Sequence, residues 1–317
     1  MELVNPLSKI ALTGGSGFLG YHLLNNEAFR EALAIGRTKP FNHQRFHKVS
    51  FDGDYSLAEA FNDKEVVVHL AARAHVMKDS AKSPLDEFRH VNTLGTLNLA
   101  RQAAIAGVKR FIFISTIKVL GEQTAPGKAF KSGDCFNPQD HYSISKMEAE
   151  VGLKSIGEAH GMEIVIIRPP LVYGQGVKGN FARLLKLVKL TIPLPFGSIQ
   201  NKRSLVSVDN LVDLIVICLN HPNAKNQCFL VSDDDDMSTS TLFSRLAEAG
   251  DYKAYIFKFP MMLLNILLRV FGKSPIYERL CGSMQVNIEH TKQQLSWKPP
   301  FSVKDSLSSC WSLDTER

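Results

Sequence analysis

Three glycines at three-residue intervals, Gly14, Gly17 and Gly20, stand between a short apolar run and a helix-like pattern in ALTGGSGFLGYHL (residues 11–23). The run KIALT predicts a strand, and FLGYHLLNN predicts the first turns of a helix. A strand–turn–helix unit of this kind can present backbone N–H groups and a helix N-terminus to the pyrophosphate of a dinucleotide. The alternative interpretation is a tight turn that binds nothing.

Short apolar runs alternate with helical patterns through the first half of the chain. Each run is rich in β-branched or aromatic residues, and the segments between the runs leave room for crossover helices. This alternation predicts an α/β fold with a doubly wound parallel sheet of the Rossmann type, covered by helices on both faces. The predicted strands are KIALT, ALAIG, VVVHLAA, FIFIST and EIVIIRPP.

The pattern changes after Pro169 and Pro170, where DNLVDLIVICLN predicts a helix and CFLVS a further strand. We expect a dinucleotide-binding domain at 1–171. Residues 172–317 are expected to form a smaller, mainly substrate-binding region, with some segments that return to the parallel sheet. The acidic run at 233–236 is interpreted as a solvated turn that caps the next helix.

The glycine spacing, with Thr13 ahead of it, resembles the TGxxGxxG fingerprint of the extended short-chain dehydrogenase/reductases, in their nucleotide-sugar epimerase/dehydratase family. Other segments resemble motifs of that family in the family's order, and together they cover almost the whole chain: DGD, HLAARAH, VNTLGT, STIKVLG, YSISK, RPPLVYG and HTKQQLSWKPP. The resemblance is strongest to a bacterial surface-polysaccharide branch. That branch includes 4-ketoreductases that form UDP-N-acetylquinovosamine and proteins similar to UDP-glucose 4-epimerases.

The resemblance implies which residues line a nicotinamide dinucleotide. In the family the glycine loop, the turn after the fourth strand, the VNxxGT helix and the RPxxVYG turn surround the cofactor. The residues implied here are Gly14, Ser16, Gly17, Phe18, Leu19, Arg37, Asp52, Leu70, Ala71, Ala72, Arg73, Asn92, Lys146 and Pro169. Of these, Asp52 is expected at the adenine and Pro169 near the nicotinamide ring.

The end of the second predicted strand, ALAIGRTK, bears on the choice of cofactor. An acidic residue at this point accepts the ribose hydroxyls of NAD, whereas an arginine accommodates the 2′-phosphate of NADP. Arg37 stands there, and no acid occurs between Ala32 and Ser50. We expect a preference for NADP(H), with Arg37 paired to the 2′-phosphate. NAD is the alternative.

Tyr142 and Lys146 in YSISK share one face of an expected helix, because they are four residues apart. The ammonium of Lys146 is expected to favour the phenolate of Tyr142 and so to lower its pKa from about 10. A chance YxxxK is the alternative that this pattern alone leaves open. The resemblance implies that Thr116 hydrogen-bonds the substrate oxygen, that Tyr142 exchanges its proton, and that Lys146 also holds the nicotinamide ribose.

The resemblance also implies contacts with the substrate, from Asn180 to the diphosphate, from Leu194 and Phe196 to the nucleotide base, and from Arg203 to the phosphates.

The chain departs from the family pattern at three positions. Leu120 replaces the tyrosine of V-Y-G, Lys118 replaces a small residue, and Ser296 replaces the glycine of the terminal motif. The first two departures concern the detailed shape of the pocket beside Thr116.

Together these residues predict an enzyme, a nucleotide-sugar oxidoreductase that acts at C4 of a UDP-hexose. Because Arg37 is expected to favour the binding of NADP(H), we expect NADPH-dependent reduction of a 4-keto UDP-sugar in surface-polysaccharide synthesis. The alternative is a UDP-glucose or UDP-N-acetylglucosamine 4-epimerase, including one whose sugar is carried on a lipid diphosphate. A remote alternative is a non-catalytic NADP-sensing protein.

The amino-acid composition limits which kinds of partner and which cellular compartment we expect for this protein. The net charge of +6 over 317 residues, without a long Lys/Arg run, argues against nucleic-acid binding. The five cysteines lack CxxC spacing, which argues against a disulfide framework and a zinc site, and no metal is expected. No signal peptide is visible, so we expect a cytoplasmic protein. The resemblance implies a homodimer.

The longest apolar stretch, YIFKFPMMLLNILLRVFGK (residues 255–273), contains Lys258, Pro260 and Arg269. Its uninterrupted pieces fall short of the roughly 20 residues needed to span a bilayer. It is interpreted as a buried helix of the second region. The alternative is an interfacial helix in peripheral contact with a membrane.

Overall fold

A seven-stranded parallel sheet organises the protein, whose computed structural model describes residues 9–51, 55–74, 83–272 and 274–312. The strand order is β3–β2–β1–β4–β5–β6–β9, and every neighbouring pair is parallel. The chain starts in the middle of the sheet, runs outward to one edge, and returns to build the other half. This is the doubly wound topology that the alternating pattern predicts, so that prediction is confirmed. The strands are β1 (Ile10–Thr13), β2 (Leu33–Gly36), β3 (Phe46–Lys48), β4 (Val66–His69), β5 (Arg110–Ile114), β6 (Glu163–Arg168) and β9 (Cys228–Leu230).

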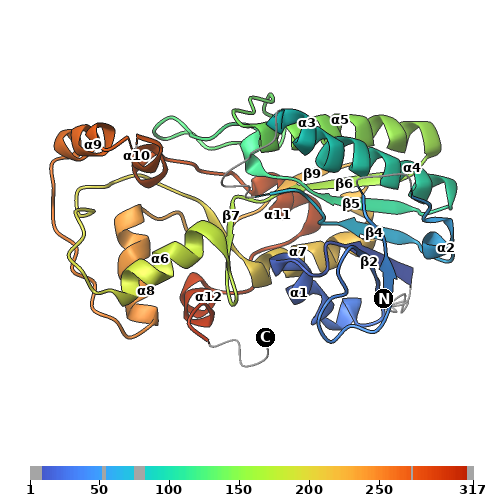
Figure 1. The fold of residues 1–317 in the computed structure, drawn as a ribbon, viewed down its shortest axis with the longest axis horizontal. Coiled ribbons are helices and arrows are strands. Elements are labelled where there is room, and N and C mark those ends of the chain that lie inside the picture. Colours follow the sequence, from blue (N-terminus) through green and yellow to red (C-terminus); the bar gives the residue numbers. More distant parts are fainter. Residues whose placement is uncertain (1–8, 52–54, 75–82, 273, 313–317) are drawn as a thin grey trace.

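Helices cover both faces of the sheet, because successive side chains of a strand point to opposite sides. In β1, Leu12 contributes to the core under one layer of helices and Ala11 to the core under the other. In Figure 1 most helices of the first layer lie below the sheet and most helices of the second lie above it. The first layer comprises α1 (Phe18–Leu24), α7 (Val208–Asn220) and α11 (Glu289–Leu295); the second comprises α2 (Ala58–Phe61), α3 (Pro84–Phe88), α4 (Thr96–Ile105) and α5 (His141–His160).

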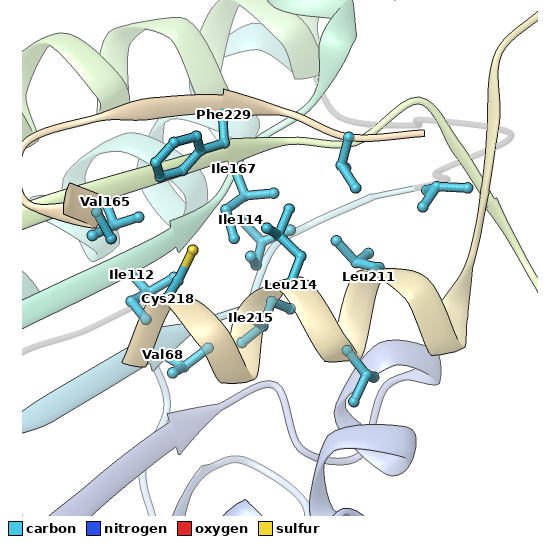
Figure 2. Packing of buried hydrophobic residues seen from close by; sticks show 14 of the residues in the cluster. Val68, Ile112, Ile114, Val165, Ile167, Leu211, Leu214, Ile215, Cys218 and Phe229 are labelled. Carbon is cyan, nitrogen blue, oxygen red and sulfur yellow. The ribbon is translucent and has the colours of Figure 1, made fainter. Parts of the chain in front are cut away.

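Helix α7 belongs to the second half of the sequence but packs on the sheet. Its side chains at 211, 214, 215 and 218 follow helical spacing and meet the strand residues shown in Figure 2. Burial of each large apolar side chain stabilises the fold by about 1.5–3 kcal/mol. Because β9 follows α7 and pairs with β6, the last part of the sheet is built from the later sequence.

A second unit surrounds a parallel pair of short strands, β7 (Leu171–Tyr173) and β8 (Leu205–Ser207). Its own core includes Tyr173, Phe181 and Phe243. Its helices are α6 (Gly179–Lys189), α8 (Thr239–Ala249), α9 (Met261–Val270), α10 (Ser274–Cys281) and α12 (Val303–Ser309). Figure 1 shows α9 and α10 at the end of the molecule farthest from α2.

Asp233, the first residue of the acidic run at 233–236, joins β7, β8 and the start of α7 by hydrogen bonds. Asp233 accepts hydrogen bonds from the Tyr173 hydroxyl at 2.7 Å, from the Ser207 backbone N–H at 2.8 Å and from the Asn210 side chain at 2.7 Å. The cap of α8 is Ser238, not an aspartate. The expectation that this run caps α8 is therefore wrong, and Asp233 is a structural acceptor, whereas Asp234 and Asp236 are exposed, as expected of a solvated turn.

The apolar stretch at 255–273 does not form the buried helix that its composition suggests. Within α9 only Leu264 is buried, whereas Met262 and Val270 remain 77% and 76% exposed. The buried-helix interpretation is therefore wrong. Of the helices in the described ranges, none is long and apolar enough to span a bilayer.

Candidate active site

Parallel strands bring the predicted site residues to one edge of the sheet. The glycine loop follows β1, Leu70 follows β4, Thr116 lies two residues beyond β5, and Pro169 follows β6. The Ile117 N–H donates to the Pro169 carbonyl at 2.9 Å, which holds the turns after β5 and β6 together. The chain reverses direction across the sheet between β1 and β4, which is where open α/β sheets bind their ligands.

The glycine loop is packed too closely for side chains. A Cβ on Gly20 would lie 2.2 Å from the Gly14 carbonyl oxygen, and one on Gly14 would lie 2.8 Å from the Ala71 backbone nitrogen. Gly14 also has φ of +75°, which favours glycine. A loop with bare backbone and no Cβ atoms fits the close approach of a pyrophosphate, so these residues fit a dinucleotide.

A buried chain of side chains ties the glycine loop to the turn after β4. The Thr13 hydroxyl lies 2.6 Å from Nδ1 of His69, and Nε2 of His69 lies 2.9 Å from the Thr96 hydroxyl. Thr13 also accepts from the Ala71 N–H at 3.2 Å. Burial, with a contribution from the charge of Lys146, lowers the pKa of His69 to about 3, so the ring is neutral. Our sequence reasoning missed these roles, although Thr13 and His69 lie in the quoted motifs.

Asn92 connects the cofactor-lining turn to α5. It lies in a π-helical segment, Arg89–Gly95, and is 1% exposed. Its side-chain oxygen accepts from the Arg73 N–H at 2.7 Å, and its amide donates to the Arg73 carbonyl at 3.1 Å and to the Ser145 hydroxyl at 3.0 Å. One side chain therefore positions both Arg73 and the helix that carries Tyr142.

Helix α5 presents Tyr142 and Lys146 one turn apart. Asp140 and Ser143 form a capping box at its start, and Gly161 ends it with φ of +70°. Lys146 is 1% exposed, and its ammonium lies 3.9 Å from the centre of the Phe113 ring.

The pKa values of this pair differ from the sequence-based expectation. Burial raises the pKa of Tyr142 to about 12, and the negative charge of Asp140 adds to the rise. Burial also lowers the pKa of Lys146 to about 7, against the opposing charge of Glu150. The pKa of Tyr142 is therefore raised and not lowered in this structure, contrary to the expectation, because burial disfavours the charged phenolate.

A buried ion pair lies next to the elements that carry Thr116 and Tyr142. Arg168, at the end of β6, contacts Glu150 at 2.6 Å, and their side chains are 3% and 0% exposed. The Ser115 hydroxyl, next to Thr116, donates to the same carboxylate. Sequence reasoning missed this network, although Glu150 follows Lys146 by four residues and so shares its helix face.

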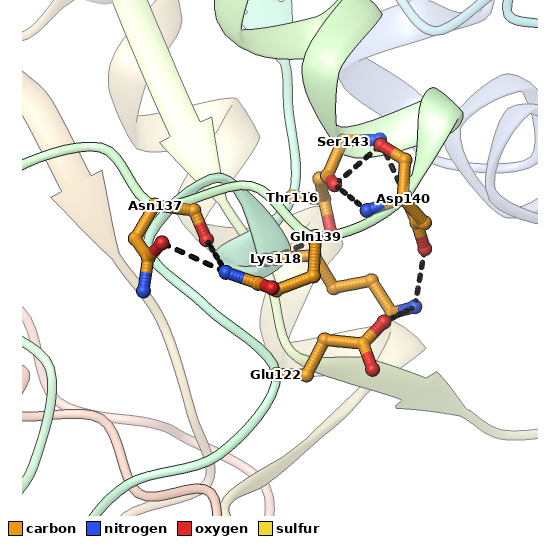
Figure 3. Close-up of polar contacts among 7 residues, drawn as sticks. All are labelled: Thr116, Lys118, Glu122, Asn137, Gln139, Asp140 and Ser143. Carbon is orange, nitrogen blue, oxygen red and sulfur yellow. Dashed lines mark hydrogen bonds and ion pairs between the residues drawn. The ribbon is translucent and has the colours of Figure 1, made fainter. Parts of the chain in front are cut away.

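Lys118, one of the departures from the family pattern, holds two carboxylates near Tyr142. Its ammonium lies 2.7 Å from Asp140 and 2.8 Å from Glu122. Figure 3 shows it between those two residues, with Thr116 close by. The Thr116 hydroxyl accepts from the Lys118 backbone N–H at 3.3 Å. The pKa of Asp140 is lowered because its hydrogen bonds with Lys118 and Ser143 outweigh the effect of burial.

Other expected cofactor-binding residues lie at the same edge. Ser16 and Gly17 are exposed, Phe18 and Leu19 are half-buried, and Arg37 is exposed directly after β2. Ala72 is half-buried in the turn after β4. Asp52 lies outside the described residues.

The expected substrate-binding residues lie in the second unit. Asn180 is exposed in the first turn of α6, and the N–H of half-buried Leu194 donates to the Tyr255 carbonyl at 2.8 Å. Phe196 is buried, and its ring centre lies 5.1 Å from that of Phe243.

Arg203 uses one guanidinium nitrogen to donate to the carbonyls of Arg279 and Gly282, at 3.1 and 2.9 Å. Its role toward phosphates, like the roles of Asn180, Leu194 and Phe196, stays a prediction.

The model of the NAD dependent epimerase/dehydratase family matches residues 10–231. The chain belongs to this family. It is 48% identical to a Vibrio cholerae UDP-glucose 4-epimerase over 94% of this chain and 93% of that protein.

Two solved structures show the same fold. A Thermotoga maritima UDP-glucose 4-epimerase with UDP-glucose has a TM-score of 0.77 at 21% identity, and a Bacillus cereus UDP-glucuronic acid 4-epimerase with NAD has 0.75 at 21%. Each match covers 95% of this chain and 97% of the other. The chain is thus an enzyme of the nucleotide-sugar epimerase class of short-chain dehydrogenase/reductases, as its motifs predict.

Proposed function

We propose that this enzyme inverts C4 of a UDP-hexose, as a UDP-glucose 4-epimerase, with a tightly held NAD. The observation that carries the proposal is the 48% identity to the Vibrio cholerae UDP-glucose 4-epimerase, which extends over nearly all of both chains. The arrangement of Tyr142, Lys146 and Thr116 near the sheet edge supports chemistry at a carbinol carbon. These findings favour the epimerase alternative over the 4-ketoreductase that Arg37 led us to expect.

The residues proposed to hold the dinucleotide surround the glycine loop: Gly14, Ser16, Gly17, Phe18, Leu19, Leu70, Ala71, Ala72, Arg73, Asn92, Lys146 and Pro169. A nicotinamide held there would supply reversible hydride exchange with C4 of the sugar. No cluster of three potential metal ligands occurs among the described residues.

The proton chemistry falls to residues of this chain. With its pKa near 12, the Tyr142 phenol carries its proton at neutral pH, so it is ready to donate to a substrate oxygen. As the base in the reverse direction it needs positive charge nearby, and protonated Lys146 supplies it one turn away. Thr116 orients the same oxygen by a hydrogen bond.

The second unit is proposed to bind the UDP moiety. On this assignment residues 1–171 bind the dinucleotide, and 172–317 supply Asn180 and Arg203 for the diphosphate and Leu194 and Phe196 for the base.

An oligomeric partner is also proposed, because three apolar side chains are exposed on α4, on α5 and on the π-helical segment before α4. Ile105, Val151 and Leu94 are 77%, 51% and 59% exposed. We propose a homodimer through the α4–α5 layer, in a cytoplasmic pathway of polysaccharide synthesis.

A second candidate is the NADPH-dependent 4-ketoreductase. It is favoured by Arg37, which lies exposed directly after β2 at the position where NADP enzymes carry an arginine. A net reductase must release its nicotinamide in every turnover, whereas an epimerase re-reduces its substrate with the same bound molecule. The state of the cofactor in the purified protein therefore separates the two candidates.

The test starts with protein purified without added cofactor. After denaturation, released nicotinamide is identified by mass spectrometry, and folded protein is assayed by NMR for interconversion of UDP-glucose and UDP-galactose. We expect stoichiometric NAD and interconversion without added cofactor. Tyr142→Phe should lower kcat by at least about 100-fold, whereas Tyr252→Phe, in the second unit, should not. An empty protein that prefers NADPH and does not interconvert the two sugars would refute the epimerase.

A further inference from the structure

Helix α9 is apolar on both sides. Leu264 faces the protein interior, as expected of a surface helix, but Met262, Leu263, Ile266 and Leu267 are 77%, 52%, 47% and 49% exposed. A surface helix of a globular protein normally carries polar side chains on its outer face, and a helix that is apolar all round is normally covered. The exposed apolar area of α9 therefore marks a candidate contact surface.

The exposed residues form one continuous stripe. At 100° per residue, positions 262, 263, 266, 267 and 270 fall within one arc of about 140°, whose centre lies about 130° around the helix from Leu264. The stripe continues into exposed Phe271, and α10, which packs against α9, adds exposed Ile276. We call the outward residues of α9 together with Phe271 and Ile276 the α9 face. It lies at one end of the molecule (Figure 1).

The charge around the α9 face is strongly one-sided. Residues 253–281 contain five basic residues and one acidic residue, and Lys258, Arg269 and Arg279 are exposed. Arg269 follows Ile266 by three residues, so it borders the stripe. An apolar stripe edged with basic residues matches a bilayer surface, where anionic headgroups lie above the acyl chains.

We propose that the α9 face seats this enzyme on an anionic lipid bilayer. A second copy of the chain fits less well, because a two-fold interface places the same patch against itself and would bring the basic residues of both copies together. Exposed Tyr255 and Phe257, just before α9, suit the boundary between headgroups and acyl chains.

Docking would place the bilayer beside the proposed substrate unit. The Leu194 and Gly197 N–H groups bond to the segment that leads into α9, at 2.8 Å to Tyr255 and 3.0 Å to Phe257. At the far end, the carbonyls of Leu280 and Gly282 accept from Asn201 at 3.1 and 2.9 Å. The α9–α10 hairpin is thus anchored on both sides to the segments that precede β8.

The test uses the full chain and sedimentation with lipid vesicles, with no activity readout, so its result does not depend on the proposed function. The vesicles contain phosphatidylcholine alone or with about one-third phosphatidylglycerol. We expect binding to the anionic vesicles, weaker binding to the neutral ones, and loss of binding as salt is raised.

Two pairs of variants complete the test. Met262→Ser with Val270→Ser removes two side chains that are about three-quarters exposed, so folding should be unaffected, and should weaken vesicle binding by at least about tenfold. Phe41→Ser with Phe301→Ser removes exposed apolar area elsewhere and should leave binding unchanged. Lys258→Glu should weaken binding to anionic vesicles, whereas Lys304→Glu, which changes the net charge equally, should not.

Three outcomes would overturn the proposal. One is the absence of binding to either kind of vesicle, and another is equal binding by the Met262→Ser, Val270→Ser protein and the wild type. The third is self-association of the wild type that this double variant abolishes, without vesicle binding, which would assign the α9 face to a second copy of the chain.

Discussion

Burial causes most of the pKa shifts of the proposed catalytic pair, and single charged side chains modify them. Tyr142 feels the negative charge of Asp140, and Lys118 partly neutralises that charge from 2.7 Å away. Lys146 lies against Phe113, and Glu150 is the charge that opposes the effect of its burial. The pH dependence of rate and stability therefore traces to a few residues.

Replacement of Lys118 by Met should shift the acidic limb of the kcat profile upward. Without the ammonium, the full charge of Asp140 raises the pKa of Tyr142 further. Asp140→Asn should shift the limb downward by up to about one pH unit, while asparagine still caps α5. Lys118→Arg, which keeps the positive charge, is the control. Identical pH profiles for all three variants would contradict the coupling.

Lys146 should make stability depend on pH above neutrality. Its pKa is lowered from 10.5 to about 7 on folding, so between these values the unfolded chain binds more protons. Stability then rises with pH across this window, by about 1.4 kcal/mol per unit from this group. Lys146→Met should be more stable than wild type at pH 7, and the difference should shrink as pH approaches 10.

Urea denaturation at several pH values measures this difference, with Lys304→Met as the exposed-lysine control. Parallel stability curves for wild type and Lys146→Met would show that burial does not lower the lysine pKa.

At the scale of elements, the ends of the strands are held together by buried polar contacts. Arg168 ends β6, Glu150 lies on α5, and Ser115 follows β5, so one network joins three elements behind Thr116. Asn92 joins the turn after β4 to α5 in the same way. These contacts set the position of α5 relative to the sheet edge.

Loss of one member of the Glu150–Arg168 pair should be costly. Glu150→Met leaves a buried guanidinium without its carboxylate and should lower the free energy of unfolding by about 3–5 kcal/mol. Glu150→Met combined with Arg168→Met should recover most of this loss, because neither charge is then buried. Glu65→Met, which removes a surface partner of Lys9, should cost under about 1 kcal/mol. Urea denaturation measures all three, and a double variant no more stable than Glu150→Met would contradict the argument.

At the scale of the whole molecule, the two units share the chain in a way that couples them. Helix α7 and strand β9 complete the sheet from within the later sequence, and α12 returns to the core of the second unit. The two tryptophans report on the two cores, since Trp297 is buried against the sheet side and Trp311 packs in the second unit.

We expect both units to unfold together. Single-tryptophan proteins made with Trp311→Phe or Trp297→Phe should show coincident urea transitions by fluorescence once the effect of each substitution on stability is subtracted. Leu214→Ala, in the centre of α7 (Figure 2), should lower the urea midpoint of both single-tryptophan proteins. The shift should correspond to a loss of about 2–5 kcal/mol in the free energy of unfolding. Separate transitions for the two probes would show independent domains.

The sequence by itself determined the sheet and the family. The apolar runs, the glycine loop and YSISK are local patterns, and local spacing is enough to predict strands, a close-packed turn and two residues on one helix face. The tertiary structure decided what depends on distant neighbours. Asp233 became an internal acceptor, the pKa of Tyr142 rose and did not fall, and α9 kept an apolar face in contact with solvent. Burial and the approach of charges from other elements control these properties, and neither can be read from spacing along the chain.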